Sequence, residues 1–407
     1  CGDLQDFLKD VPFAQEYPRR RTADAVPVPD SLTFKRDARV STQQAFGNIL
    51  NEIGRSDAQI AEHIVTTSPD VAVSTNLGPW INRRGLFDRR EHTDTFKSEK
   101  VISAQSWDIS QTGQHIELGI AENNLFLMLS AMGLSHSLFG KRLLPIGTLY
   151  DPFISRGLDA MNYACYQDSR FMLVATPSGV TLAPEGGAHQ SIYTPLIGMG
   201  QPGLTSFEPA FADELAEIMR WGFEHMQADE GGSVYLRLST RPIDQVAREL
   251  DDTLRADILS GGYWLREPSA DADIAIIAIG TMAPEALAAH ETLVEDIPGA
   301  GLLVATSADR LMADWHHARR HRRAGMPAEP SHVERLLSRL PSHTGLVTVL
   351  DGHPATLSWM GGVRRHRIQS LGVEDFGRSA DIPDIHAVHG IDADSILDAA
   401  ARLCLTG

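Results

Sequence analysis

The sequence predicts an α/β protein with two domains, each a mostly parallel sheet flanked by helices. From about Phe34 onward, apolar runs of strand length alternate with helical stretches, the pattern of a parallel sheet covered by helices. A charged stretch at 241–260 interrupts this alternation, which then resumes. The chain has 407 residues, more than one ordinary core supports. We therefore expect a linker or arm over 1–33, a first domain over 34–250 and a second over 251–407.

Each element is predicted from its apolar spacing. In the longest predicted helix, Leu125, Leu129 and Met132 recur at helical spacing. The first block is expected to contain helices at 42–53 and 122–138 and strands at 64–67, 143–150, 171–176 and 233–238. The second block is expected to contain strands at 274–280, 302–306 and 346–351 and helices at 284–295, 333–340 and 392–403. The basic segment HHARRHRR at 316–323 is expected to be a solvated or partner-facing loop, since charge runs are usually solvated.

Composition and charge exclude several classes of protein. The chain has 36 Lys and Arg against 53 Asp and Glu, a formal net charge of −17, whereas nucleic-acid binding needs clustered positive charge. Hydrophobic residues make up 43% and charged residues 22%, so neither a disordered chain nor a fibre fits. No apolar run reaches the roughly 18 residues of a membrane helix, and no signal-peptide pattern opens the chain. Three widely spaced cysteines match no disulfide framework or zinc motif, so we expect a cytoplasmic protein.

Two clusters contain residues that could do chemistry. Glu122, in the segment GIAEN, opens a helix, where the dipole favours a carboxylate, so it is either an ordinary helix-start glutamate or a functional acid. His189, in the segment EGGAHQS, lies in a Gly- and Pro-rich loop after a strand, where α/β sheets place ligands. Tyr150 and Phe153 follow another strand and are either core rings or part of the same site.

In this order, GIAEN, the pair Tyr150 and Phe153, and EGGAHQS resemble the pyrimidine-binding domain of thiamine-diphosphate enzymes of the transketolase and pyruvate dehydrogenase superfamily. The resemblance runs from about Val40 to Leu403 and is closest to the homodimeric bacterial pyruvate dehydrogenase, its decarboxylating component. The segment GVEDFGRS at 372–379 is similar to a GTDGFGRS stretch of these enzymes. The resemblance implies a thiamine-diphosphate-binding fold followed by a transketolase C-terminal-like domain, which contributes to the dimer and not directly to catalysis.

The resemblance implies a role for each candidate residue. Glu122 corresponds to the glutamate that hydrogen-bonds N1′ of the cofactor pyrimidine, and an acid on one side of that ring makes its other side basic. Tyr150 and Phe153 correspond to the aromatic pair around the aminopyrimidine. His189 corresponds to the histidine that donates to the substrate carbonyl oxygen. Glu185 is placed to orient that histidine.

Two further residues match shorter motifs. Asp70, in the segment SPD, lies where transketolases carry a Ser-Ala-Asp-Leu motif at the cofactor cleft. Arg241, in LSTR, resembles the Leu-Ser-Arg stretch in which transketolases bind phosphate, a role that suits a guanidinium. It is equally well an ordinary arginine that closes a strand. Where transketolases carry a His-Asp pair, the segment TPSG at 176–179 is closer to the Thr-Ser-Gly of pyruvate dehydrogenases.

One motif of the superfamily is missing from this chain. These enzymes bind the diphosphate and Mg²⁺ through Gly-Asp-Gly followed by Asn, and the sequence contains no such motif. A hard cation that holds phosphates needs a fixed cluster of oxygen ligands. We therefore expect no metal ligand in this chain and a partner chain or domain that carries the motif, in a homodimer or heterotetramer. The chain would then be a natural subunit or the C-terminal half of a longer polypeptide.

The resemblance implies thiamine-diphosphate-dependent decarboxylation of a 2-oxoacid, pyruvate first among them, with acyl transfer to a lipoyl group of an acyltransferase. The alternative is transketolase-like transfer of a two-carbon ketol unit, which Arg241 would favour. A second alternative is a non-catalytic assembly subunit, because a fold does not imply a function. Such a subunit would have no chemical need for Glu122.

Overall fold

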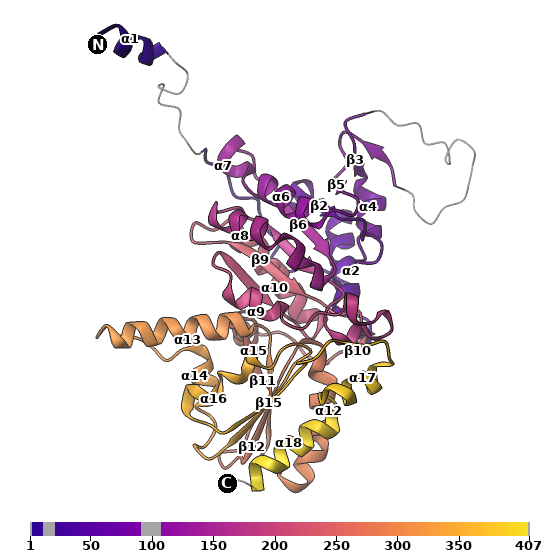
Figure 1. Cartoon of the computed structure of the whole chain (residues 1–407), viewed down its shortest axis with the longest axis vertical. Coiled ribbons are helices and arrows are strands. Elements are labelled where there is room, and N and C mark those ends of the chain that lie inside the picture. The colour runs from indigo at the N-terminus through magenta and orange to yellow at the C-terminus, as the bar shows by residue number, and fades with distance from the viewer. Residues whose placement is uncertain (1, 11–20, 91–106, 406–407) are drawn as a thin grey trace, which may run out of the picture.

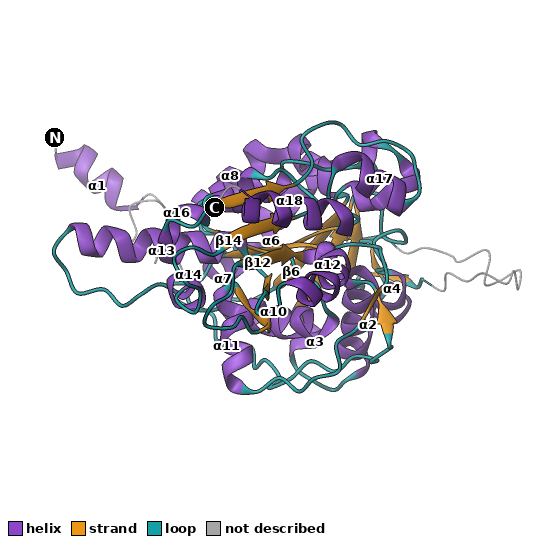
Figure 2. Ribbon diagram, turned by 90° about the horizontal axis from the view of Figure 1, so that it is seen from below, coloured by secondary structure: helices purple, strands orange, loops and turns teal. Residues whose placement is uncertain are grey.

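The structure is a computed structural model that describes residues 2–10, 21–90 and 107–405. Two sheet units follow one another along the chain, the first in the upper half of Figure 1 and the second in the lower half. Viewed from below, helices surround both sheets (Figure 2). A mixed α/β architecture with mostly parallel sheets is therefore confirmed. The division of the chain at 33 and 250 stays a prediction.

The first unit is built on an eight-stranded sheet in the order β4-β3-β5-β2-β6-β7-β9-β8. All its neighbouring strands run parallel. The strands are β2 Ile64–Ser68, β3 Leu86–Phe87, β4 Ile109–Ser110, β5 His115–Glu117, β6 Leu144–Leu149, β7 Met172–Ala175, β8 Leu204–Phe207 and β9 Ser233–Arg237. The helices are α2 Thr42–Arg55, α3 Ile60–His63, α4 Gly78–Arg84, α6 Glu122–Gly133, α7 Ser135–Phe139, η2 Asp151–Gly157, α8 Leu158–Tyr166, η3 Val180–Glu185, η4 Gly187–His189, α9 Thr194–Gly200 and α10 Ala212–His225.

Both faces of this sheet are buried, so the central strand β7 is apolar throughout, and polar residues of other strands lie inside as well, such as Thr66, Thr67 and Arg237. Successive side chains of a strand point to opposite faces. On β7, Met172 and Val174 join a core under α2, α4 and α10, whereas Leu173 and Ala175 join a second core under α6 and α8. The sheet is thus held between two helical layers, and its strand ends are free to support loops.

The second unit is built on a five-stranded sheet in the order β11-β13-β12-β14-β15, parallel except for the antiparallel edge strand β11. Its strands are β11 Gly262–Arg266, β12 Ile274–Ile279, β13 Gly301–Ala305, β14 Gly345–Val349 and β15 Ile368–Leu371. Its helices are α11 Asp252–Ser260, η5 Gly280–Met282, α12 Ala283–Asp296, α13 Ala308–Arg323, α14 His332–Leu337, α15 Ala355–Ser358, α16 Gly361–Arg364, α17 Ile382–His389 and α18 Ala393–Leu405.

Three elements differ from the sequence prediction. Residues 316–323 are not a loop but the last two turns of α13, because Leu311, Trp315 and Ala318 bury one face of that helix. The helix predicted at 122–138 is two helices, α6 and α7, that meet at Leu134. The charged stretch at 241–260 contains β10 Ile243–Asp244, which pairs with β1 Arg39–Val40, and then α11.

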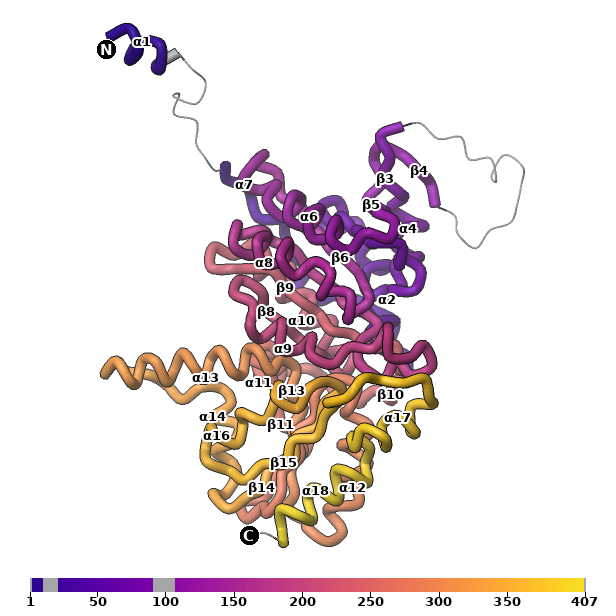
Figure 3. The backbone as a smooth tube through the Cα atoms, in the orientation of Figure 1, coloured from indigo at the N-terminus to yellow at the C-terminus, as the bar shows by residue number. Residues whose placement is uncertain are grey.

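The N-terminal arm contains structure of its own. A helix, α1 Gly2–Asp10, lies near the chain start, with most of its side chains exposed. Residues 21–33 form no helix or strand, yet Val26 and Leu32 are buried against the first unit. From Arg21, whose backbone N–H donates to the carbonyl oxygen of Ser137 on α7, the described backbone runs into the first unit (Figure 3). No described helix is long and apolar enough to span a membrane.

Candidate active site

The candidate residues follow strands that end at one edge of the first sheet. Asp70 comes two residues after β2, Tyr150 directly after β6, and Glu122 five residues after β5. His189 lies in the loop that begins after β7. Because β5, β2, β6 and β7 are parallel neighbours, their carboxyl ends meet at this edge. Open α/β sheets bind ligands at such an edge.

Three of the candidate rings form one cluster. The rings of Tyr150 and Phe153 are nearly parallel, with an interplanar angle of 8° and centroids 6.0 Å apart. The imidazole of His189 meets both of them edge-on, at 5.8 Å from Tyr150 and 5.6 Å from Phe153. This arrangement suits a flat, polar ligand, since aromatic rings offer stacking faces and imidazole a hydrogen-bonding nitrogen.

Glu122 is linked to the aromatic cluster through an arginine that the sequence analysis passed over. It is the first residue of α6 and is buried, a position where the helix dipole stabilises its negative charge. Its carboxylate pairs with the guanidinium of Arg156, which lies on η2. That guanidinium in turn covers the ring of Phe153 at 3.8 Å from the ring centroid. Glu122, Arg156, Phe153 and His189 are therefore one continuous set of contacts.

The segment that presents the two rings is anchored by a buried acid that was also passed over. Asp151, between Tyr150 and Phe153, is fully buried. Its carboxylate accepts hydrogen bonds from Tyr235 at 2.5 Å, from the Nε of Arg237 at 2.9 Å, and from two hydroxyls, those of Ser191 and Thr194. The sequence contained a signal for this residue: Asp151 is an acid that follows a strand and lies between two aromatic residues.

Arg237 extends this anchor toward the second unit. It is buried and donates to Glu208 at 2.6 Å and to the carbonyl oxygen of Asp351, which follows β14, at 2.7 Å. Burial raises the pKa of Glu208 to about 7, although the attraction of Arg237 opposes this rise. The support beneath Tyr150 and Phe153 is therefore a charged network shared by both units.

The second unit also holds the loop of His189. Asp351 accepts the backbone N–H groups of Val180 and Thr181, at 2.8 and 2.9 Å. The side chain of Gln190 donates to the carbonyl oxygen of Arg378 at 3.0 Å. That carbonyl lies within the 372–379 stretch that the sequence analysis singled out. The position of His189 thus depends on residues from both units.

Asp70, Glu185 and Arg241 lie outside the ring cluster. Asp70 is exposed, and its backbone N–H donates to Glu117 at 2.7 Å. Glu185 is exposed at the end of η3, and the described residues show no hydrogen bond between it and His189. Arg241 pairs with Glu285 of α12 at 2.8 Å. The structure therefore brings together Glu122, Tyr150, Phe153 and His189, but not these three.

The fold and this site define a class of protein. Transketolase from Leishmania mexicana has the same fold, with a TM-score of 0.67 and 17% identity over 94% of this chain and 47% of that one. A split-gene transketolase, described as an inactive beta4 tetramer, gives a TM-score of 0.59 and 20% identity over 90% of this chain and 99% of that one. The chain is a member of the thiamine-diphosphate-dependent transketolase and pyruvate dehydrogenase superfamily.

Within this superfamily the family is also defined. The family of the pyruvate dehydrogenase E1 component middle domain matches residues 30–241, and the chain belongs to it. The pyruvate dehydrogenase E1 component of Mycolicibacterium smegmatis is 27% identical over 95% of this chain and 42% of the relative. A 6-deoxy-6-sulfo-D-fructose transketolase subunit of a Clostridium species is 29% identical over 49% of this chain and 58% of the relative. The chain thus spans less than half of the M. smegmatis protein.

Proposed function

We propose that this chain is one half of a thiamine-diphosphate-dependent enzyme that decarboxylates a 2-oxoacid, pyruvate first among the candidates. The acyl group would pass to the lipoyl group of an acyltransferase component. The observation that carries the proposal is the continuous contact from Glu122 through Arg156 and Phe153 to His189 at the carboxyl edge of the sheet. The similarity to a pyruvate dehydrogenase E1 component over 95% of the chain supports the choice of reaction.

The residues fit an aminopyrimidine. The guanidinium of Arg156 is itself a planar group that stacks on Phe153 and donates to Glu122. One planar group with hydrogen-bond donors can therefore stack on the ring of Phe153 and donate to the carboxylate of Glu122 at the same time. An aminopyrimidine has the same planarity and offers ring and amino nitrogens for such contacts. The side chain of Arg156 is 51% exposed, so it is free to turn toward solvent and release this place.

Each residue then has a definite task. Thiamine diphosphate, when bound, supplies a nucleophilic carbon for attack on the substrate carbonyl. Glu122 holds a proton at its carboxylate oxygen and shares it with the pyrimidine nitrogen. Tyr150 and Phe153 orient the pyrimidine ring by stacking. The imidazole of His189 donates a hydrogen bond to the substrate carbonyl oxygen, where negative charge develops.

The proposal requires a partner. The sequence contains no Gly-Asp-Gly motif, and the described residues include no group of three His, Cys, Asp or Glu side chains that could hold a metal ion. A second chain or domain would therefore supply the ligands for Mg²⁺ and the diphosphate. The split-gene transketolase, of which this chain covers 99%, supports an enzyme divided at this point. A cytoplasmic location remains part of the proposal.

Transfer of a ketol unit is the second candidate reaction. The 29% identity to a sugar transketolase subunit favours it. Against it, the arginine proposed to bind a sugar phosphate, Arg241, already has a carboxylate partner in Glu285. A guanidinium paired in this way offers fewer free donors to a phosphate.

The substrate is tested by an assay of the complete enzyme, this chain together with its diphosphate-binding half. We expect CO₂ release from pyruvate with an artificial electron acceptor, dependent on added thiamine diphosphate. If pyruvate is inert while a ketose phosphate donates a two-carbon unit, the transketolase function replaces the decarboxylase. If neither reaction occurs and thiamine-diphosphate binding by the complete protein does not depend on Glu122, the chain is an assembly subunit.

A further inference from the structure

A cavity of about 1060 Å³ lies where α13 meets the first unit. Its walls are residues 199–205 of the first unit, one face of α13, and residues 327–335 before and within α14. None of the candidate active-site residues lines it. Its size lies at the upper end of the range for small-molecule sites, about 300–1,000 Å³. The basic segment at 316–323, to which the proposed function assigns no role, lies in its wall.

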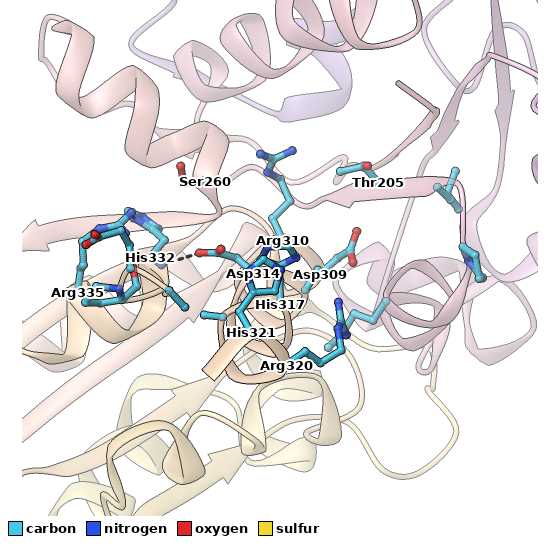
Figure 4. A pocket seen from close by; sticks show the side chains of 18 of the residues that line it. Thr205, Ser260, Asp309, Arg310, Asp314, His317, Arg320, His321, His332 and Arg335 are labelled. Carbon is cyan, nitrogen blue, oxygen red and sulfur yellow. Dashed lines mark hydrogen bonds between the residues drawn. The ribbon is translucent and has the colours of Figure 1, made fainter. Parts of the chain in front are cut away.

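Two arginines and two histidines of α13 line this wall. Arg310, His317, Arg320 and His321 recur along α13 at spacings of seven, three and one, so they face one side of the helix. Figure 4 shows these side chains together on the wall that α13 contributes. The rings of His317 and His321 lie 4.1 Å apart. Within the described part of the chain, none of the four side chains makes a hydrogen bond or an ion pair.

The acids of the same wall already have partners. Asp309 accepts the backbone N–H of Ser206 at 2.9 Å, and Asp314 accepts that of His332 at 2.7 Å. Burial raises the pKa of Asp309 to about 6, against the attraction of Arg310, and the carboxylate remains mostly ionised at pH 7. Glu329 and Arg335 also line the cavity, which therefore holds three carboxylates and three arginines. Its character depends on which of these groups still have free hydrogen-bonding atoms.

Arg310 is held in place without a hydrogen-bonded partner among the described residues. Its guanidinium lies over the ring of Trp221 at 4.9 Å and over that of Phe207 at 5.9 Å. Burial lowers the pKa of Arg310, although the attraction of Asp309 and Asp314 opposes this shift. By contrast, Arg322 on the same helix pairs with Glu334 at 2.6 Å. A stacked, half-buried guanidinium with unused N–H donors is preorganised for an anion.

We propose that this cavity binds an elongated small molecule that carries phosphate groups. The planar fork of a guanidinium matches the oxygens of a phosphate. Of the three arginines that line the cavity, Arg335 forms hydrogen bonds with Pro330 and His332. By contrast, Arg310 and Arg320 keep their donors free of hydrogen bonds within the described residues. Arg310 and Arg320 are ten residues apart, roughly 15 Å along the helix axis. The ligand therefore extends along α13, with phosphates near Arg310 and Arg320 and its remaining part beside His317 and His321.

The probe is inorganic tripolyphosphate, titrated calorimetrically into the protein with its partner half and saturating thiamine diphosphate. We expect one site per chain. Arg320→Ala and Arg310→Gln should each weaken binding by about tenfold or more, since a hydrogen bond to a charged group is lost. Arg323→Ala removes the same charge from the same helix but lies outside the cavity wall. It should weaken binding by less than about twofold.

Three results would overturn the proposal. The first is the absence of tripolyphosphate binding. The second is equal weakening by Arg323→Ala and Arg320→Ala, which would indicate general attraction to a basic helix. The third is equally tight binding of citrate, which would show that the site does not recognise phosphate. Because Arg320 is exposed, its substitution leaves the fold intact even if that of Arg310 does not.

Discussion

Arg156 contacts both the carboxylate of Glu122 and the ring of Phe153. A carboxylate at a helix start and a ring face are arranged so that one planar donor satisfies both. Glu122 lies in a buried position, whereas Arg156 is half exposed. The carboxylate is therefore fixed, and the arginine is the movable partner. Under the proposed function, such a site would select flat nitrogen-containing rings over aliphatic ligands.

At the same scale, His225 predicts how stability depends on pH. Burial and the nearby Arg310 lower the pKa of His225 to about 4. In the unfolded chain this imidazole takes up a proton near pH 6.5. The contribution of His225 to the free energy of unfolding is therefore fully present above about pH 6.5, and it is lost as the pH falls toward 4. Because His225 is partly exposed to solvent, we reduce the free energy that corresponds to its pKa shift and expect a loss of about 2 kcal/mol in the free energy of unfolding. Urea unfolding at several pH values measures this loss.

The variant His225→Phe isolates this contribution. Phenylalanine keeps the stacking on Trp221, whose ring centroid lies 4.4 Å from that of His225, but it cannot take up a proton. The fall in stability between pH 6.5 and 4 should be about 2 kcal/mol smaller in the variant. Parallel curves for the two proteins would contradict the lowered pKa.

Some site residues could be predicted from the sequence and others could not. Glu122, Tyr150, Phe153 and His189 were found because each follows a recognisable strand or loop, and the structure brings them together. Their catalytic and binding roles stay predictions. Arg156 was missed because its partner is 34 residues away, and such pairing depends on tertiary packing.

At the scale of elements, strands were predicted better than charged helices. Strands such as β7 and β12 were found because burial on both faces makes them continuous apolar runs. Helix α13 was missed because its run of charges was taken as solvent-exposed loop. The apolar spacing of Leu311, Trp315 and Ala318 was the signal that predicts a helix there. The break between α6 and α7 has no comparable signal.

The loop of His189 gives a prediction at this scale. Gly187 lies so close to the second unit that a Cβ atom would meet the carbonyl oxygen of Gly377 at 2.4 Å. Gly187→Ala should therefore displace the loop and destabilise the protein by about 1–3 kcal/mol. It should also lower the activity of the complete enzyme. Thermal unfolding and the pyruvate assay measure the two effects.

The matched control is Gly200→Ala. Nothing lies within 4 Å of a Cβ atom at Gly200, so this variant should be neutral or slightly more stable. If Gly187→Ala and Gly200→Ala have the same stability and activity, the close contact with the second unit does not fix the position of the His189 loop.

At the scale of the whole molecule, the second unit does more than complete the fold. Asp351 and the stretch at 372–379 hold the loop that carries His189. Arg241 and Glu285 add a second connection between the units. Hydrogen bonds from His386 and Arg241 hold the pKa of Glu285 below its usual value, although burial opposes this shift. The geometry of the candidate site is therefore a property of both units.

A double-mutant cycle tests this connection. Arg241→Gln and Glu285→Gln should each lower the free energy of unfolding, and the double variant should lose less than their sum. For a partly buried pair we expect a coupling energy of about 1–3 kcal/mol from urea unfolding. Strictly additive losses would show that the pair does not join the units. A selective rise in KM for a sugar phosphate without loss of stability would instead favour ketol transfer.

The chain as a whole covers less than half of the M. smegmatis relative but nearly all of the split-gene transketolase chain. This is why its activity is proposed only together with a second half. The sequence predicted the need for that half from the absence of Gly-Asp-Gly. The fold alone does not indicate that a second half is needed, because the first unit has a complete hydrophobic core of its own.

The most direct test of the account is the exchange Glu122→Gln in the complete enzyme. Glutamine keeps the shape of the side chain, and its amide can donate a hydrogen bond, but it has no acidic proton to transfer to a pyrimidine nitrogen. We expect CO₂ release from pyruvate to fall by about 100-fold or more, with unchanged thermal unfolding. The control, Glu62→Gln on the surface of α3, should keep full activity. Equal activity of the Glu122→Gln and Glu62→Gln enzymes would contradict the proposed role of Glu122 and with it the proposed function.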